Sequence, residues 1–411
     1  MGTKQERQIL GLRRNALTIS ITEFIAGMGI FLTTPFWSVY VLSLGASVTM
    51  VGVLGTISGL FTAALMCPVG LLSDRIGRKK PVVIAGFIAS LGPFLQFLAS
   101  DWVQLIPGII LASLFQVMGP VRQSIVADEL RPEERITGFA AFFTIIMLPS
   151  ACMPLVSGYI MDQIGLSNGM RLCLILSGIL MLVASIIRAK FLKQEKKDPH
   201  LAAEKGRTSL KAGIKEMFEP LLVLRDLRIL IAGSVGVMFI FGILQSYSSV
   251  YVVDVLNISK TDWGLISTIV GFSSVCIRIP ISKLTIKLGN RKAIVLSNFG
   301  RSIYPIAFVY AQNFLNLTLF GIGYTIAFNI GSPAYQVLIT ELAPARMRGR
   351  AYGVFGMMWG AMAPLSTPIG GAIWETWSPQ WAFFLASLSG LLSSIFLYFF
   401  LWKFNKKSDA I

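Results

Sequence analysis

The sequence GLLSDRIGRKK runs from Gly70 to Lys80 between two apolar stretches, and a weaker copy, SKLTIKLGNRK, runs from Ser282 to Lys292. The two copies begin 212 positions apart in a chain of 411 residues. Because this spacing is just over half the chain, it indicates an internal duplication. The pattern predicts a duplicated membrane domain with one marked cytoplasmic loop in each half.

The composition supports a membrane protein, since 54% of the residues are hydrophobic and only 14% are charged, which leaves too little polar surface for a soluble protein of this length. The apolar residues fall into runs of about 20, the length that a helix needs to cross a bilayer. Helices are expected because a segment in lipid must satisfy its own backbone hydrogen bonds. We therefore predict an all-α integral membrane protein with twelve spans, centred on residues 16–42, 49–71, 81–100, 103–126, 138–161, 171–190, 229–253, 263–281, 293–311, 314–340, 351–374 and 380–402.

The net charge of +16 is distributed by loop parity. Odd-numbered connections hold mainly Arg171 and Lys260. By the positive-inside rule, both termini and every even-numbered connection are predicted to be cytoplasmic, and nucleic acid is not expected as a partner. The cytoplasmic assignment depends on the basic residues Lys4, Arg7, Arg13, Arg14, Arg75, Arg78, Lys79, Lys80, Lys283, Lys287, Arg291, Lys292, Arg346, Arg348, Arg350, Lys403, Lys406 and Lys407.

Three segments are predicted: an N-terminal six-helix bundle (1–190), a cytoplasmic linker (191–228) and a C-terminal six-helix bundle (229–411). Within the linker, apolar residues recur at helical spacing from Leu210 to Leu222, which suggests an amphipathic helix at the cytoplasmic membrane face. The segment is interpreted as a linker that tethers the two bundles, and a partner-binding role is the alternative. The duplication recurs outside the loops, because Pro68, Gly119 and the Glu-Leu-x-Pro at Glu129 have counterparts 212 positions later.

Other chemistries find little support in the sequence. The four cysteines lie within expected spans without metal-ligand spacing, and the single histidine, His200, lies in the linker. We find no phosphate-binding GxxxxGK[ST] loop, so coupling to ATP is not expected, and any coupling should be to an ion gradient. No metal, organic cofactor or enzymatic activity is expected. The first apolar run is too long for a cleavable signal and is expected to be retained.

The first loop resembles the signature that the major facilitator superfamily carries between helices two and three, with its characteristic residues at Gly70, Leu72, Asp74, Arg75, Gly77, Arg78 and Lys79. The resemblance implies two pseudo-symmetric six-helix bundles and transport by alternating access. It further implies that Asp74 lies at the N-terminal end of helix eleven, where the helix dipole favours a negative charge.

The same loop is expected to act as a conformational latch. Arg78 is expected to pair with Asp128 and so contribute to a latch between the halves. Gly70 is expected to permit close helix packing, and Gly77 a tight turn. The alternative is a loop that only fixes orientation. In the second copy Ile286 replaces the aspartate, so no equivalent latch is expected there.

Charged residues inside spans are costly and call for a reason. Glu23 lies about eight residues into span one, roughly 12 Å below its cytoplasmic end. Arg122, near the cytoplasmic end of span four, is a plausible partner, and we hypothesise that the pair is the proton-coupling site. The alternatives are a static ion pair or a snorkelling side chain. Arg278 and Arg301 are interpreted as snorkelling to the headgroups.

Polar and aromatic residues on spans four, seven, ten and eleven are candidates for a substrate cavity. Each one is equally consistent with an interhelical hydrogen bond or a core contact. Methionines around Trp359 also favour a soft apolar cavity. The candidates are Gln116, Gln123, Gln245, Tyr247, Asn329, Tyr335, Gln336 and Trp359.

Within the superfamily, the sequence is most similar to drug–proton antiporters, although incompletely. Span five keeps Pro154 and Gly158 of the antiporter motif but has Met153 and Ser157 where glycines are expected, and Phe115 replaces an arginine of span four. The preferred function is proton-coupled export of hydrophobic or amphipathic small molecules. The alternatives are uptake of a polar metabolite (a sugar, carboxylate or amino acid) and a sensor that does not transport. A monomer in the cell membrane is expected.

Overall fold

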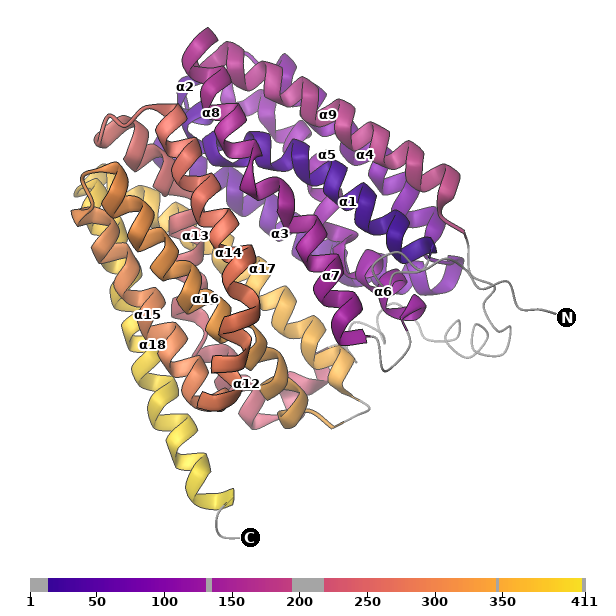
Figure 1. Ribbon diagram of the computed structural model, residues 1–411, viewed down its shortest axis with the longest axis vertical. Helices are drawn as coiled ribbons and strands as arrows, with labels where there is room; N and C mark the ends of the chain where they lie inside the picture. The colour runs from indigo at the N-terminus through magenta and orange to yellow at the C-terminus, as the bar shows by residue number, and fades with distance from the viewer. Residues whose placement is uncertain (1–13, 131–134, 194–217, 345–346, 409–411) are drawn as a thin grey trace, which may run out of the picture. The chain divides into compact units, whose positions relative to one another are not determined.

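The computed structural model describes residues 14–130, 135–193, 218–344 and 347–408 (Figure 1). Within these ranges the side chains of Cys67, Leu71, Asp74, Arg75, 135–137, Ala140, Ile279 and 402–408 are not described. All regular elements of the described ranges are helices, as the sequence predicts.

The chain divides into two compact units. The first comprises Met1–Leu44 and Phe61–Gly213, and the second comprises Gly45–Leu60 and Ile214–Ile411. The division falls inside one helix, α3 (Val48–Ile76), whose first half packs with the second unit and whose remainder packs with the first.

In the first unit, α9 packs along both α1 and α4, and α4 also packs against α5. The shorter helices α6, α7 and α8 pack against α1 or its neighbours. Besides the second half of α3, the unit contains α1 (Arg14–Thr33), η1 (Thr34–Phe36), α2 (Trp37–Ser43), α4 (Lys79–Leu98), η2 (Trp102–Gln104), α5 (Leu105–Val117), α6 (Gly119–Glu129), α7 (Arg135–Met147), η4 (Leu148–Ala151), α8 (Met153–Ile164) and α9 (Leu166–Phe191).

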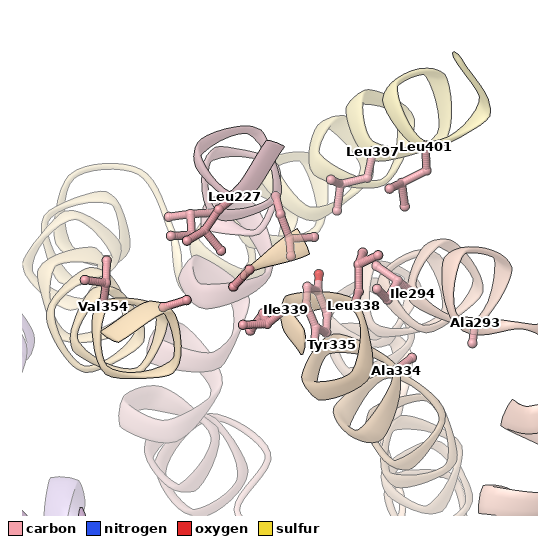
Figure 2. Packing of buried hydrophobic residues seen from close by; sticks show 14 of the residues in the cluster. Leu227, Ala293, Ile294, Ala334, Tyr335, Leu338, Ile339, Val354, Leu397 and Leu401 are labelled. Carbon is pink, nitrogen blue, oxygen red and sulfur yellow. The ribbon is translucent and has the colours of Figure 1, made fainter. Parts of the chain in front are cut away.

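In the second unit, α15 packs against both α16 and α18, and α13 packs against α17 and α18. One core cluster is formed by Leu227, Ile294, Tyr335, Leu338 and their neighbours (Figure 2). Besides the first half of α3 and the helical residues 218–223, the unit contains α12 (Arg225–Ala232), α13 (Val235–Val250), η5 (Tyr251–Val255), α14 (Lys260–Leu288), α15 (Asn290–Tyr310), α16 (Phe314–Leu342), α17 (Arg348–Thr376) and α18 (Pro379–Ser408).

The backbone conformation supports the internal repeat. Gly77 and Gly289, equivalent in the two loop sequences, both have positive φ, at 90° and 77°. Gly45, with φ of 86°, is matched 212 positions later by Asn257, the one non-glycine residue with positive φ in the described ranges, at 54°. Glycine and asparagine tolerate this region better than other residues. The same chain reversal is therefore built at the same two points of each half.

Proline and glycine break several helices. Pro120 follows Gly119 at the start of α6, where the fourth expected span divides into α5 and α6. In α14 the segments Lys260–Arg278 and Pro280–Leu288 meet at 58°. Proline removes a backbone donor and clashes with the preceding turn, so a bend at each place is expected.

Nine helices of the described residues are long and apolar enough to cross a membrane, or ten if the bent α14 is counted as one span. Of the twelve expected spans, 293–311 and 351–374 form helices of sufficient length, α15 and α17, but these do not pass the same test of composition. The protein is thus an all-α, multi-span membrane protein, for which the count of twelve remains consistent.

Candidate functional site

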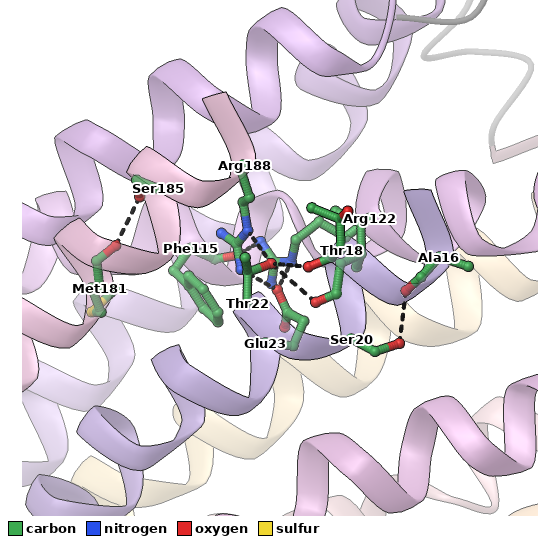
Figure 3. Close-up of polar contacts among 11 residues, drawn as sticks. Ala16, Thr18, Ser20, Thr22, Glu23, Phe115, Arg122, Met181, Ser185 and Arg188 are labelled. Carbon is green, nitrogen blue, oxygen red and sulfur yellow. Dashed lines mark hydrogen bonds and ion pairs between the residues drawn. The ribbon is translucent and has the colours of Figure 1, made fainter. Parts of the chain in front are cut away.

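Glu23 of α1 lies between two arginines in the first unit (Figure 3). Its Oε1 atom is 2.5 Å from Nε of Arg122 on α6 and 2.7 Å from Nη2 of Arg188 on α9. The three side chains are 11%, 5% and 1% exposed, respectively. We call these residues the Glu23 cluster. The carboxylate is therefore shared by two guanidinium groups in a largely dehydrated site.

Two further groups hold the arginines in place. Arg188 Nε donates a hydrogen bond of 2.9 Å to Oγ1 of Thr22, whose hydroxyl donates in turn to the carbonyl of Thr18. Arg122 Nη1 donates to the carbonyl of Phe115 at 2.7 Å, and its Cζ lies 4.0 Å from the centroid of the Phe115 ring. Because Phe115 is in the last turn of α5, its carbonyl is among those that a helix end leaves without an intrahelical donor. The break between α5 and α6 thus supplies a hydrogen-bond acceptor for Arg122.

The cluster carries excess positive charge, since two guanidinium groups and one carboxylate leave a formal charge of +1. Removing charges from water costs several kcal/mol per ion, and only good pairing offsets this cost. Arg122 Nε makes a close ionic contact with Glu23 but no aligned hydrogen bond within the described structure. A local charge of +1 disfavours the binding of a cationic ligand beside Glu23.

Sequence reasoning proposed the partner Arg122 but missed Arg188. Arg188 lies near the end of span six beside Lys190, so it is easily taken for an ordinary topogenic charge. The sequence did hold a signal. Arg188 lies one helical turn before the end of α9 at Phe191, at helical spacing from small or apolar residues. The structure shows that this face of the helix is buried, with Ser177, Met181, Ala184, Ser185 and Arg188 on it.

The loop motif is partly described. Arg78 Nη1 forms an ion pair with Oδ2 of Asp128 and also donates to the carbonyl of Ser124 at 3.2 Å. Both partners belong to the first unit, so this pair holds the start of α4 to α6 and does not itself join the two halves. Lys79 is the first residue of α4. The side chains of Asp74 and Arg75 lie outside the described residues.

Two glycines of the motif behave differently. Gly77 adopts the positive φ that its predicted tight turn requires. A methyl group placed at Gly70 would meet nothing within 4 Å, so close packing against described atoms does not require a glycine there. In the second copy, Asn290 stands where Arg78 does and donates to Oε1 of Glu341 at 3.0 Å. A neutral donor therefore replaces the cation in the repeat.

The cavity candidates fall into two groups. Tyr247, Asn329 and Tyr335 are buried and hydrogen-bonded within the second unit. Tyr247 donates to the carbonyl of Thr367, Asn329 to Ser274 Oγ, and Tyr335 exchanges hydrogen bonds with Asn298. Gln116, Gln123, Gln245 and Gln336 are exposed, and Trp359 is half-buried. The exposed or half-buried residues are the ones free to meet a ligand.

The two arginines interpreted as snorkelling also differ. Arg278 of α14 is exposed. Arg301 of α15 is only 3% exposed and lies among aromatic rings of α16 and α17, so the snorkelling interpretation of Arg301 is wrong. Distance from a helix end along the sequence does not reveal which face of the helix is covered.

Taken together, an all-helical multi-span protein with a repeated half and buried charges inside its helices defines a membrane transporter of the duplicated type. The family model of the Major Facilitator Superfamily matches residues 19–366 and 252–410, and the chain belongs to this superfamily. It is therefore a transporter of that superfamily rather than a member of an enzyme class.

Relatives and structures support this assignment. The chain is 24% identical over 391 residues to the multi-drug resistance efflux pump PmrA of Streptococcus pneumoniae, covering 91% of this chain and 92% of that protein. In fold it is similar to the nucleoside transporter NupG, with a TM-score of 0.76, 14% identity and coverage of 93% and 99% of the two chains. It is also similar to the human organic anion transporter MFSD10, with a TM-score of 0.67, 14% identity and the same coverages.

Proposed function

We propose that the protein is a proton-coupled exporter of hydrophobic or amphipathic small molecules and that Glu23 is its coupling residue. The observation that carries the proposal is the burial of Glu23 between Arg122 and Arg188. Protonation of a buried carboxylate removes its ionic contacts with the neighbouring arginines, and so changes the relative stability of the conformations that depend on these contacts. The similarity to PmrA favours export.

The coupling step follows from the charges. A proton on Glu23 Oε1 removes the carboxylate charge, breaks both ionic contacts and raises the formal charge of the cluster from +1 to +2. Two like charges in a site of low dielectric repel, so the protonated cluster favours a conformation in which the arginines separate or meet water. Protonation and deprotonation then favour two different conformations, as alternating access requires.

The remaining parts of the proposal concern place and assembly. The basic even-numbered loops support cytoplasmic termini in a cell membrane. The pair of Arg78 and Asp128 fixes the loop to α6 within the first unit, and the exposed Gln116, Gln123, Gln245 and Gln336 are the proposed polar contacts of a substrate cavity. The proposed assembly is a monomer whose partners are a small-molecule substrate, protons and lipid.

The second candidate function is uptake of a polar metabolite together with protons. The net positive charge of the Glu23 cluster favours it for an anionic substrate, because an anion could take the place of Glu23 beside Arg122. The two functions differ in the direction of the proton flux relative to that of the substrate.

The direction is measured in proteoliposomes with three fluorescent dansyl compounds: dansylglycine, dansylamide and dansylcadaverine. Export by antiport predicts accumulation when the lumen is acidic, whereas symport predicts accumulation when the medium is acidic. Glu23→Gln should abolish the effect of the gradient but retain exchange of substrate across the membrane, and Asp101→Asn, an exposed carboxylate, is the control. Gradient-driven accumulation that persists in Glu23→Gln would overturn the coupling role.

A further inference from the structure

Arg301 of α15 is a buried cation without an acidic partner in the described part of the chain. Its residue surface is 3% exposed, and no carboxylate of the described residues lies within ion-pair distance. Its Nε and Nη2 atoms are fully buried and find no hydrogen-bond acceptor there. A guanidinium group presents five N–H donors in one plane, so this buried side chain has donors without an acceptor among the described residues.

Three aromatic rings surround the guanidinium group. Its Cζ lies 5.8 Å from the ring centroid of Tyr324, 5.2 Å from that of Phe328 and 5.5 Å from that of Trp359. Aromatic rings attract a cation through their π-electrons. They do not satisfy N–H groups that point along the guanidinium plane, so the rings alone do not explain why these donors remain open.

The three rings are less completely covered than the guanidinium group. Tyr324, Phe328 and Trp359 are each only half-buried, while the guanidinium group between them is almost fully buried. The hydroxyl of Tyr324 is also buried without a partner among the described residues. The Arg301 site, defined as Arg301 with these three aromatic residues, therefore combines half-buried aromatic rings with buried donors that have no acceptor among the described residues.

We infer that the Arg301 site binds the carboxylate of an amphipathic organic acid, whose apolar ring packs against Tyr324, Phe328 and Trp359. An arginine accepts a carboxylate through two parallel N–H···O bonds, which satisfies the open donors and neutralises the buried charge together. The aromatic rings supply the apolar contact that such a molecule needs. A cationic ligand is disfavoured because it would bring a second positive charge to the site.

This inference rests on the proposed transport function, since it names the substrate class, but not on the direction of transport. It is tested by binding alone, in detergent micelles without a proton gradient. The readout is energy transfer from tryptophan to the dansyl group, and Trp359→Phe identifies the share that comes from Trp359. The probes share one ring system: dansylglycine is an acid, dansylamide is neutral and dansylcadaverine is a cation.

The wild-type protein should bind dansylglycine at least about tenfold more tightly than dansylamide, and dansylcadaverine least tightly, since hydrogen bonds to charged groups are worth about one to two orders of magnitude in affinity. Arg301→Gln should abolish the preference for the acid and Arg301→Lys should retain part of it. Arg228→Gln, which removes the same charge from an exposed position of α12 in the same unit, should leave it unchanged.

Equal binding of the three probes by the wild-type protein, or a preference for the acid that survives in Arg301→Gln, would overturn the Arg301 site. Size-exclusion chromatography shows whether Arg301→Gln folds. If it does not, the Arg301 site is still tested by the order of affinities of the three probes for the wild-type protein and by the loss of energy transfer in Trp359→Phe. Because no gradient is present, failure here leaves the proton-coupled function untouched, and failure of coupling in proteoliposomes leaves this binding test valid.

Discussion

The buried arginines of the two units are in opposite electrostatic situations. Arg122 and Arg188 share the carboxylate of Glu23, and both have further acceptors in the Phe115 carbonyl and the Thr22 hydroxyl. Arg301 has aromatic neighbours and no acidic partner in the described part of the second unit. The first unit therefore neutralises its buried arginines with a carboxylate of its own, whereas the second unit leaves Arg301 available to the carboxylate of a bound ligand.

The repeat makes this difference more informative. At the offset of 212, Arg122 corresponds to the fully buried Ala334, and Arg301 corresponds to the fully buried Ala89. Ala89 packs in a cluster with Phe115, the ring beneath Arg122. The two halves therefore keep matched turns at Gly45, Gly77, Asn257 and Gly289 but have exchanged alanine and arginine at matched positions. This favours separate roles: proton coupling in the first unit and substrate binding in the second.

The largest expected effect is that of Glu23→Gln on stability. Removing one partner of a buried ion pair leaves the other charges uncompensated, so a loss of about 3 to 5 kcal/mol in the free energy of unfolding is expected. Denaturant unfolding in micelles measures it, with Asp101→Asn as the exposed control. A loss below about 1 kcal/mol would mean that the arginines do not depend on Glu23.

Arg301→Met should behave differently, because Arg301 has no carboxylate partner among the residues that the structure describes. The substitution loses cation–π attraction but also removes an uncompensated buried charge, so the free energy of unfolding should change by less than about 2 kcal/mol. The same unfolding experiment, run without ligand, gives the answer. A loss as large as that of Glu23→Gln would show that Arg301 is a structural cation and would break the comparison.

Thr22→Val tests the second acceptor of Arg188. Valine keeps the shape of threonine but leaves Arg188 Nε without its 2.9 Å hydrogen bond, and a loss of about 1 to 2 kcal/mol is expected. Thermal unfolding compared with Thr376→Val, whose hydroxyl bonds only within its own helix near the end of α17, isolates this contribution. Equal losses in the two variants would argue against a special role for Thr22.

The smallest effect concerns Glu375, one residue beyond the predicted span 351–374. Burial acts to raise the pKa of its carboxyl, but hydrogen bonds from the Thr49 hydroxyl and backbone N–H, at 2.6 and 2.9 Å, outweigh this, and the pKa is lowered. A lowered folded-state pKa contributes stability above the unfolded pKa, and this stability is lost as pH falls through the folded value.

The thermal midpoint of the wild-type protein should therefore fall slightly more than that of Glu375→Gln between about pH 7 and pH 4. Parallel curves for the two proteins would show that Thr49 does not hold this carboxylate in solution.

Much of the fold could be predicted from sequence, because apolar runs and basic loops are dictated by the bilayer. The repeat was visible in the loop sequences, and positive φ at Gly77 and Gly289 is the physical reason why each copy has a glycine at that position. The candidate site was only half predictable. Glu23 stands out as an acid in an apolar run, but helix faces decide its neighbours, and Arg188 looked like a topogenic charge.

The other differences have the same origin. Tyr335 and Asn329 are polar residues on an expected cavity helix, yet they are buried and hydrogen-bonded to residues of neighbouring helices. Arg301 is close enough to a helix end to snorkel, yet rings from α16 and α17 cover it. Sequence gives the depth of a residue along a helix, whereas packing sets the direction in which it points.

The most direct test compares Glu23→Gln and Arg301→Gln in the same proteoliposomes, measuring both exchange and gradient-driven accumulation of dansylglycine. If the first unit couples protons and the second binds substrate, Glu23→Gln loses accumulation but keeps exchange, and Arg301→Gln loses both. Accumulation that persists in Glu23→Gln would contradict the account.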